Sequence, residues 1–184
     1  MESETQNLEE LVDEFINFST EKFSTWTDCA NEEELRLLVN TLSLSSEICD
    51  TAASLNVSVV NRRDFKGRGH DAIAEKYTRA AVFSIRRIFQ CLARLSALHK
   101  IKLIDLMVNE INGEVSVAAF PDCCALLILN SAARVGRAAR HMSSTGILSP
   151  DELKMAMHYV TKYCLDLGML MRIEEAEFLR PDSK

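Results

Sequence analysis

The chain has 184 residues, of which 47% are hydrophobic and 26% charged, with six glycines, three prolines and a net charge of −6. This composition is typical of one soluble globular domain, and so few helix-breaking residues favour long helices over a sheet with tight turns. The acidic N-terminal segment does not resemble a secretory signal, and no apolar run reaches the roughly 18 residues of a membrane span. We therefore expect one all-α domain over residues 1–184, a bundle of six to seven helices without membrane contact.

The cysteines and histidines give no sign of a metal site or of nucleophilic catalysis. The six cysteines form no Cys-x-x-Cys pair, and the four histidines have no serine or cysteine partner at a motif spacing. This pattern favours reduced core thiols in an intracellular protein over a disulfide framework or a zinc site. We expect no cofactor and no bound metal, a location in the cytoplasm and also in the nucleus, and a hydrogen-bonded core role for His99.

The first half of the chain reads as helices interrupted by one basic segment. Apolar residues at helical spacing predict a helix over residues 7–25. Asn31 and Glu34 have the spacing of a capping box, which predicts a second helix that runs to about residue 55. Residues 56–70 contain two glycines and a cluster of basic side chains, so we expect a mobile, exposed basic loop there. A long third helix is expected over about 71–99 and a short fourth over about 102–112.

The second half contains two further helices with clear start signals. Pro121 fits the first turn of a fifth helix, which is expected to end near Thr145 and Gly146. The sequence Ser-Pro-Asp-Glu at residues 149–152 supplies a cap, a proline and two acids, and it predicts a sixth helix that runs to about Arg172. Residues 173–184 are expected to fray, and no stretch reads as a strand.

Basic residues form stripes on two of these helices. At about 100° per residue, the arginines of the third helix share one side, opposite an apolar half. Arg134, Arg137 and His141 share a face of the fifth helix, with Arg140 to one side. A solvated outer face is one interpretation. Two stripes and a basic loop together favour phosphate binding, because the arginine fork makes paired bonds to phosphate oxygens. The candidate nucleic-acid-binding residues are Arg62, Arg63, Lys66, Arg68, Arg79, Arg86, Arg87, Arg94, Arg134, Arg137, Arg140 and His141.

Two blocks of the sequence resemble the translin family, which contains translin and translin-associated factor X. Residues 77–111, YTRAAVFSIRRIFQCLARLSALHKIKLIDLMVNEI, resemble the third and fourth helices of that family. Residues 120–172, which contain LLILNSAARVGRAARHM, resemble the next two helices. The resemblance implies an all-α bundle that assembles into closed, hollow shells. It further implies that translin-like subunits bind single-stranded nucleic acid and that factor X-like subunits carry a magnesium-dependent endoribonuclease site.

The resemblance also implies that this chain is not the nuclease. The metal ligands of factor X-like subunits are two glutamates on the third helix and an aspartate–glutamate pair on the fifth. These positions align with Arg87 and Gln90, and with residues near Ile128 and Ala132. Magnesium needs carboxylate oxygens, which these side chains lack. The implied role is a non-catalytic subunit whose arginines line the shell interior and bind single-stranded RNA or DNA. The resemblance further implies that this subunit forms homo-oligomers, or hetero-oligomers with a translin-associated factor X-like subunit.

Two other classes of protein stay open. In all-α nucleotide pyrophosphohydrolases, paired acidic motifs hold magnesium at a triphosphate, and Glu47 and Asp50 have the spacing of one such pair. The second pair is missing, because the third helix has Arg86 and Arg87 instead. The other alternative is a structural adaptor whose sixth helix packs against a partner helix through apolar and small residues, namely Leu153, Met155, Met157, Val160, Cys164, Leu167 and Met169.

Overall fold

The computed structural model describes residue 12 and residues 33–108, 120–145 and 150–179. Within these residues the chain is all-α without strands, which confirms the predicted fold class. Among the described helices, none has the length and apolar character needed to cross a membrane. The helices are α2 (Glu33–Phe65), α3 (Asp71–His99), α4 (Leu103–Val108), α5 (Pro121–Thr145), α6 (Pro150–Met171) and α7 (Glu175–Leu179).

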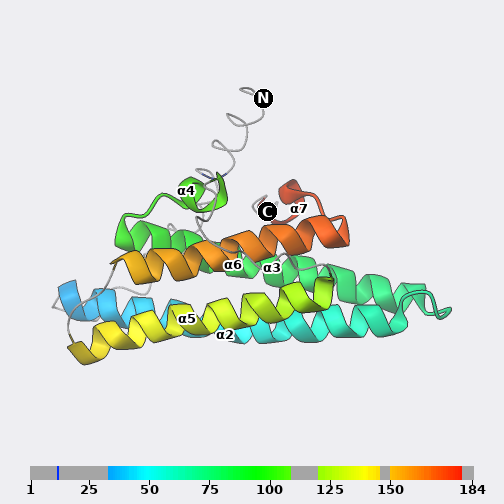
Figure 1. Cartoon of the computed structure of the whole chain (residues 1–184), viewed down its shortest axis with the longest axis horizontal. Helices are drawn as coiled ribbons and strands as arrows, with labels where there is room; N and C mark the ends of the chain where they lie inside the picture. Colours follow the sequence, from blue (N-terminus) through cyan, green and yellow to red (C-terminus); the bar gives the residue numbers. More distant parts are fainter. Residues whose placement is uncertain (1–11, 13–32, 109–119, 146–149, 180–184) are drawn as a thin grey trace, which may run out of the picture.

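Of the described helices, α2, α3, α5 and α6 are long and form the bundle, and the short helices α4 and α7 cover one side of it (Figure 1). α2 packs against both α3 and α5, α5 packs against α6, and α6 also reaches α3. α4 contacts α6 and α3, while α7 contacts α3. The hairpin of α2 and α3 extends past the ends of α5 and α6, so its connecting turn stands clear of the rest of the bundle.

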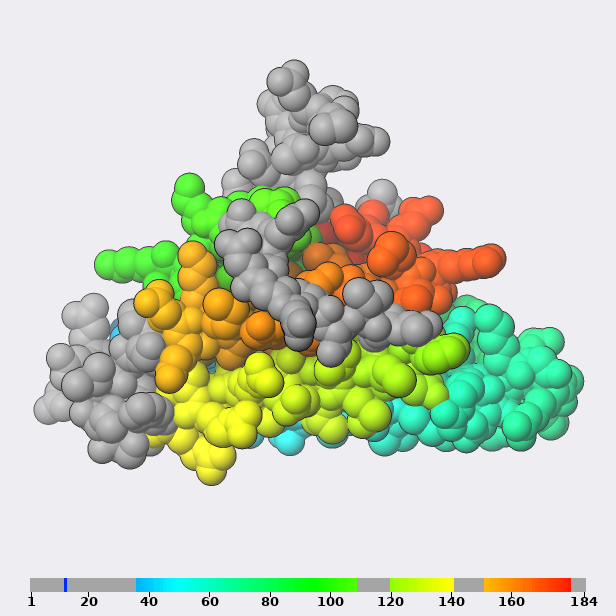
Figure 2. All heavy atoms as spheres, in the orientation of Figure 1, coloured from blue at the N-terminus to red at the C-terminus, as the bar shows by residue number. Residues whose placement is uncertain are grey.

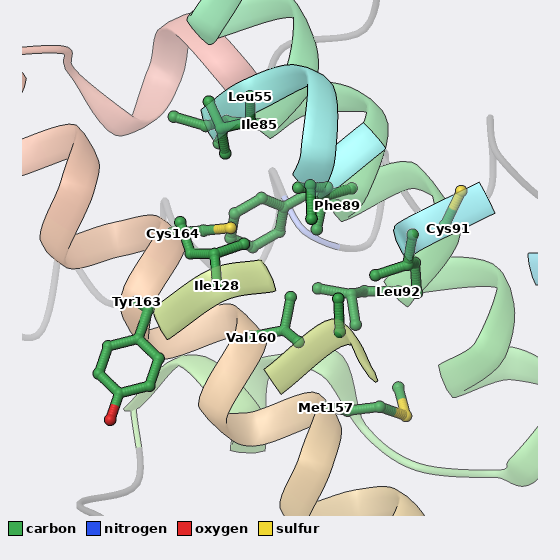
Figure 3. Packing of buried hydrophobic residues seen from close by; sticks show 14 of the residues in the cluster. Leu55, Ile85, Phe89, Cys91, Leu92, Ile128, Met157, Val160, Tyr163 and Cys164 are labelled. Atoms are coloured by element: carbon green, nitrogen blue, oxygen red, sulfur yellow. The ribbon is translucent and has the colours of Figure 1, made fainter. Parts of the chain in front are cut away.

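The core lies where α2, α3, α5 and α6 meet. Ile85, Phe89 and Leu92 of α3 follow helical spacing and are fully buried, together with Ile128 of α5 and Cys164 of α6 (Figure 3). The apolar half predicted for the third helix is therefore the face that packs. The described cysteines, Cys49, Cys91, Cys123, Cys124 and Cys164, are all free thiols.

The predicted basic loop over residues 56–70 is wrong for most of its length, because α2 continues through Phe65. The prediction rested on the two glycines and the basic cluster, but both glycines lie after Phe65, at positions 67 and 69. Residues 56–61 contain five Asn and Val residues in six positions, and both types are weak helix formers. Tertiary packing outweighs this weak propensity. Val59 is 1% exposed, and the Arg62 Nε donates a hydrogen bond to Thr78 Oγ1 of α3 at 3.0 Å. The turn is confined to residues 66–70.

The expected fraying after residue 172 is also wrong for the residues that the structure describes. Residues 175–179 form α7, in which Phe178 and Leu179 are fully buried. The Phe178 ring stacks on Phe89 with centroids 5.2 Å apart. Directly before α7, the N–H of Glu174 donates to Glu177 Oε1 at 3.2 Å, which caps the first turn. This segment is therefore a packed element of the fold.

The remaining helix predictions agree with the structure wherever it describes them. α3, α5 and α6 begin and end within a residue of the predicted limits, and α4 begins at Leu103. The helix expected over 7–25 and the side chains of the Asn31–Glu34 capping box lie outside the described residues, apart from buried Val12. His99 is hydrogen-bonded as expected. The Thr41 hydroxyl donates to Leu37 O, so it accepts from His99 Nε2 at 2.8 Å. Burial lowers the pKa of His99.

The C-terminus of α3 ends on a residue with a left-handed backbone. Lys100 has φ 55°, its N–H donates to Ala97 O, and the N–H of Ile101 donates to Ser96 O. This is a Schellman motif, in which glycine is the usual residue. We expect Lys100→Gly to raise the free energy of unfolding by about 0.5–1 kcal/mol, because glycine adopts this conformation without the clash of a Cβ.

Urea unfolding followed by circular dichroism would measure this effect. Lys76→Gly is the matched control, since Lys76 is exposed in the interior of α3. It should lose about 1 kcal/mol. A loss of stability in both variants would contradict the proposed helix end.

Candidate nucleic-acid interface

The two central arginines of the predicted stripe on α3 contact other helices of the same chain. The Arg86 Nη2 donates a hydrogen bond to the carbonyl oxygen of Glu177 in α7. Arg87 forms an ion pair with Glu47 of α2, and its Nη1 donates to Gln90 Oε1 at 3.3 Å. Both side chains are half-buried. They hold α7 and α2 against α3, which leaves less of their hydrogen-bonding capacity for phosphates.

The outer two arginines of the same stripe have different surroundings. Arg79 is exposed near the free end of the hairpin. Arg94 is half-buried on α3, close enough to the Cys91 thiol for its positive charge to oppose the rise in the pKa of that thiol. The four arginines therefore share a side of the helix, but they do not form one open surface.

The positions that the resemblance aligns with metal-binding acids carry no side chain suited to a magnesium ion. Ile128 and Ala132 of α5 are fully buried in the core. The carbonyl of Ala132 accepts a hydrogen bond from the Cys49 thiol of α2 at 3.3 Å. Arg87 and Gln90 lie instead on α3, where Arg87 meets α2 through Glu47. Ala132 of α5 and Arg87 of α3 thus both contact α2, at Cys49 and Glu47.

The Glu47 side chain, one member of the candidate pyrophosphohydrolase pair, is engaged by its neighbours. It pairs with Arg87 and lies beside Cys91, where burial together with the Glu47 charge raises the pKa of the thiol to about 12. A carboxylate held by a guanidinium has weaker attraction for a cation. In the described part of the chain, no three His, Cys, Asp or Glu side chains are grouped so that they could hold a metal ion.

The basic residues of α5 lie beside acidic residues of α6. Arg134, Arg137 and Arg140 are exposed, while the side chain of His141 lies outside the described residues. Arg134 sits over the ring of Tyr159 at 5.5 Å, and it lines a groove of about 570 Å³ together with Arg137. The opposite wall of this groove contains Asp151 and Glu152. Those two carboxylates repel phosphates, so the groove is of mixed charge and not a basic surface.

The free end of the α2–α3 hairpin concentrates positive charge. Residues 62–79 contain six arginines and lysines against three acidic residues, a net charge of +3 in a chain of −6. Lys66, Arg68 and His70 are exposed. Lys66 and Arg68 form no ion pair with any residue that the structure describes. Arg63, by contrast, is paired with Asp64 and with Asp122 of α5.

Aromatic rings support this turn. Phe65 stacks on Tyr77 with centroids 5.9 Å apart and makes an edge contact with His70 at 6.0 Å. Gly67 and Gly69 have φ 74° and 76°, a backbone that only glycine adopts readily, and the N–H of Gly67 donates to Asp71 Oδ1. The turn is therefore short, and it brings exposed cations and half-buried rings together. Figure 1 shows this turn at the tip of the projecting hairpin.

Comparisons of the chain with protein-family models, with curated proteins and with solved structures find no match.

The cations of the hairpin end were predicted from the sequence, but Phe65 and Tyr77 were not predicted to lie beside them. Asp151 and Tyr159 were likewise not predicted to lie opposite the arginines of α5. The contact between Phe65 and Tyr77 could have been predicted from a short turn at KGRGH, because such a turn brings the residues before and after it together. The acids in the first turn of α6, Asp151 and Glu152, have no feature in the sequence that predicts their position beside α5.

Proposed function

We propose that this chain is a non-catalytic, translin-like helical subunit that binds the phosphates of single-stranded RNA or DNA through the free end of its α2–α3 hairpin. The proposal includes assembly with further copies or with a translin-associated factor X-like subunit. The observation that carries it is the net charge of +3 over residues 62–79, with Lys66 and Arg68 exposed and without ion pairs among the described residues.

The local charge favours a phosphate ligand although the whole chain is acidic. A phosphate responds to the field of the nearest charges, because screening at physiological salt limits that field to about 8 Å. Arg62, Lys66, Arg68 and Arg79 all belong to the projecting end of the hairpin, and the only described acids of residues 62–79 are Asp64, Asp71 and Glu75. Asp64 pairs with Arg63, and Asp71 accepts from Gly67 N–H.

A single strand fits this end better than a duplex does. Sites for single strands combine cations along the backbone with aromatic rings on which bases stack. Phe65 and Tyr77 are half-buried, so each keeps part of its surface at the tip, next to Lys66 and Arg68. The proposal for the site therefore moves from the arginine stripe of α3 to the hairpin end, because Arg86 and Arg87 bind other parts of the chain.

We propose that the chain is not catalytic because of the residues at the positions that align with the metal-binding acids of factor X-like subunits. Ile128 and Ala132 have no oxygen donor in their side chains, and both are fully buried. Arg87 carries a positive charge that repels a cation, and it is paired with the nearby carboxylate of Glu47. A partner subunit would therefore have to supply any metal-binding acids of the assembly.

The expected result for Lys66→Glu/Arg68→Glu is a loss of affinity for a single-stranded oligonucleotide of at least about tenfold, since two phosphate contacts become repulsive. The slope of log K against log salt should fall by roughly 1.4, at about 0.7 per phosphate of a single strand. Fluorescence anisotropy of a labelled 20-nucleotide strand, titrated at several salt concentrations, measures both quantities.

The matched control is Arg36→Glu/Lys102→Glu, which changes the net charge of the chain by the same amount. Both residues are exposed, and the Thr41–His99 hydrogen bond places them at the end of the hairpin opposite the turn. The control should leave the salt slope unchanged. Equal losses of affinity in the two double variants would mean that the oligonucleotide senses only the total charge, and the proposed site would be wrong.

A further inference from the structure

The groove between α5 and α6 separates its charges onto two walls. The α5 wall carries Arg134 and Arg137, and the α6 wall carries Asp151 and Glu152. Met155 lines the same groove and is 49% exposed. Figure 2 shows the surfaces of α5, in yellow-green, and α6, in orange, as neighbours on one face of the molecule. The groove is thus an open, partly apolar strip with one basic wall and one acidic wall.

We propose that this groove is the contact surface for a second copy of the chain in a two-fold symmetric dimer. A two-fold interface brings the same patch of both copies together, so a patch with opposite charges on its two walls complements itself. In this dimer Arg137 of each copy faces the acidic wall around Asp151 of the other, and the exposed Met155 side chains pack between them. This dimer is one form of the assembly between copies that is part of the proposed function, and it rests on that part.

Apolar side chains extend the strip along both helices. Met169 lies 14 residues after Met155, close to four full turns, and Leu126 lies 11 residues before Arg137, close to three. They therefore continue the same faces of α6 and α5, and they are 71% and 55% exposed. α6 has 22 residues, about 33 Å of helix, and two helices are about 20 Å wide. That strip is comparable with the roughly 800 Å² per partner of a standard interface.

The charge pattern also selects the orientation of the two copies. A two-fold axis along the helices places α5 of one copy over α6 of the other, which brings basic walls onto acidic walls. An axis across the helices places α5 over α5, with arginine against arginine. The first arrangement keeps both α2–α3 hairpins at the same end of the dimer, because rotation about that axis does not reverse the helix direction. Two basic hairpin ends then face one nucleic-acid strand from the same side.

The test uses the full chain and two charge reversals in exposed side chains, Arg137→Glu and Asp151→Arg. Sedimentation equilibrium should give the wild type twice the 20.7 kDa of one chain. Each variant alone should raise the dimer Kd by at least about tenfold, because both symmetric contacts become repulsive. An equimolar mixture of the two variants should dimerise again. In the mixed dimer, Glu at 137 of one chain faces Arg at 151 of the other in one contact, and the native pair of Arg137 and Asp151 is kept in the second contact.

Recovery on mixing separates an interface from an effect within one chain, because a contact inside the chain cannot be restored by adding another variant. Unchanged helical circular dichroism shows that the variants are folded.

A wild type that stays monomeric at about 100 μM would contradict the proposed dimer, and so would a mixture that stays as dissociated as its components. Anisotropy on the same samples tests the hairpin end independently. If the chain binds the oligonucleotide but does not dimerise, only the proposed dimer is contradicted. If it dimerises but does not bind the oligonucleotide, only the nucleic-acid part of the proposed function is contradicted.

Discussion

Phe178→Ala is expected to lower the free energy of unfolding by about 3–5 kcal/mol, the range for deleting a fully buried phenylalanine side chain. The ring is 0% exposed and stacks on Phe89 of α3. It also closes against α6, because a Cβ added to Gly168 would lie 3.3 Å from Phe178 Cε1. Removing the ring leaves a cavity between three helices, which the rigid packing of α3 and α6 cannot fill. Urea unfolding monitored by circular dichroism measures the loss.

Phe83→Ala is the matched control, since Phe83 is the same residue type and is 67% exposed on α3. It should change the stability by no more than about 0.5 kcal/mol. Hydrogen exchange adds a second measurement, because loss of the Phe178 anchor should release the α7 amides before those of the bundle. If the two alanine variants unfold at the same urea concentration, α7 is not a packed part of the fold.

The packing of α7 could not be predicted from the sequence for a physical reason. A helix of five residues is too short to show a periodic apolar face, so EAEFL carried no pattern that separated it from a frayed end. Its stability comes from Phe89 and Gly168, which lie 89 and 10 residues before Phe178 in the sequence. Short elements of this kind are stabilised by tertiary contacts and not by their own propensity.

The long helices were predictable because their ends carry local signals. Pro121 and Pro150 each occupy the first position of a helix, where the missing N–H has no cost, and acids follow both prolines. Glycines at 67 and 69 marked the turn before α3. The basic cluster of residues 62–70 was misleading, because it suggests an exposed loop, whereas α2 continues to Phe65 and Val59 is buried against the bundle.

The arginine stripe shows where helical periodicity stops being informative. The period of 3.6 residues places Arg86 and Arg87 on one side of α3, whereas in the structure Arg86 contacts α7 and Arg87 contacts α2. Periodicity does not reveal which groups oppose that side. Glu47 is 40 residues away in the sequence, and the carbonyl of Glu177 is 91 residues away. A basic stripe therefore indicates that carboxylates or other oxygen acceptors lie opposite it, and these groups can belong to the same chain.

Ile128→Asp is expected to unfold the chain or to lower its stability by more than about 4 kcal/mol, because a fully buried position receives a charge without a partner. Ile128 is 0% exposed in the core formed with Phe89 and Cys164 (Figure 3). The resemblance to the translin family places one of the metal-binding acids of the nuclease subunits near this position. An acid there would face apolar side chains, and folding would require it to be protonated or to find water. Thermal unfolding and analytical gel filtration measure the effect.

Ile128→Val separates the loss of packing from the cost of the charge, since it removes one methylene and should lower the stability by only about 0.5–1.5 kcal/mol. If the aspartate variant instead folds with near-normal stability and gains affinity for Mg²⁺ in calorimetry, position 128 opens to a polar cavity and the chain retains the outline of a nuclease site. If it unfolds, restoring one acid cannot convert this chain into a nuclease. Position 128 is then a packed core position, as is position 132, and both are fully buried in the structure.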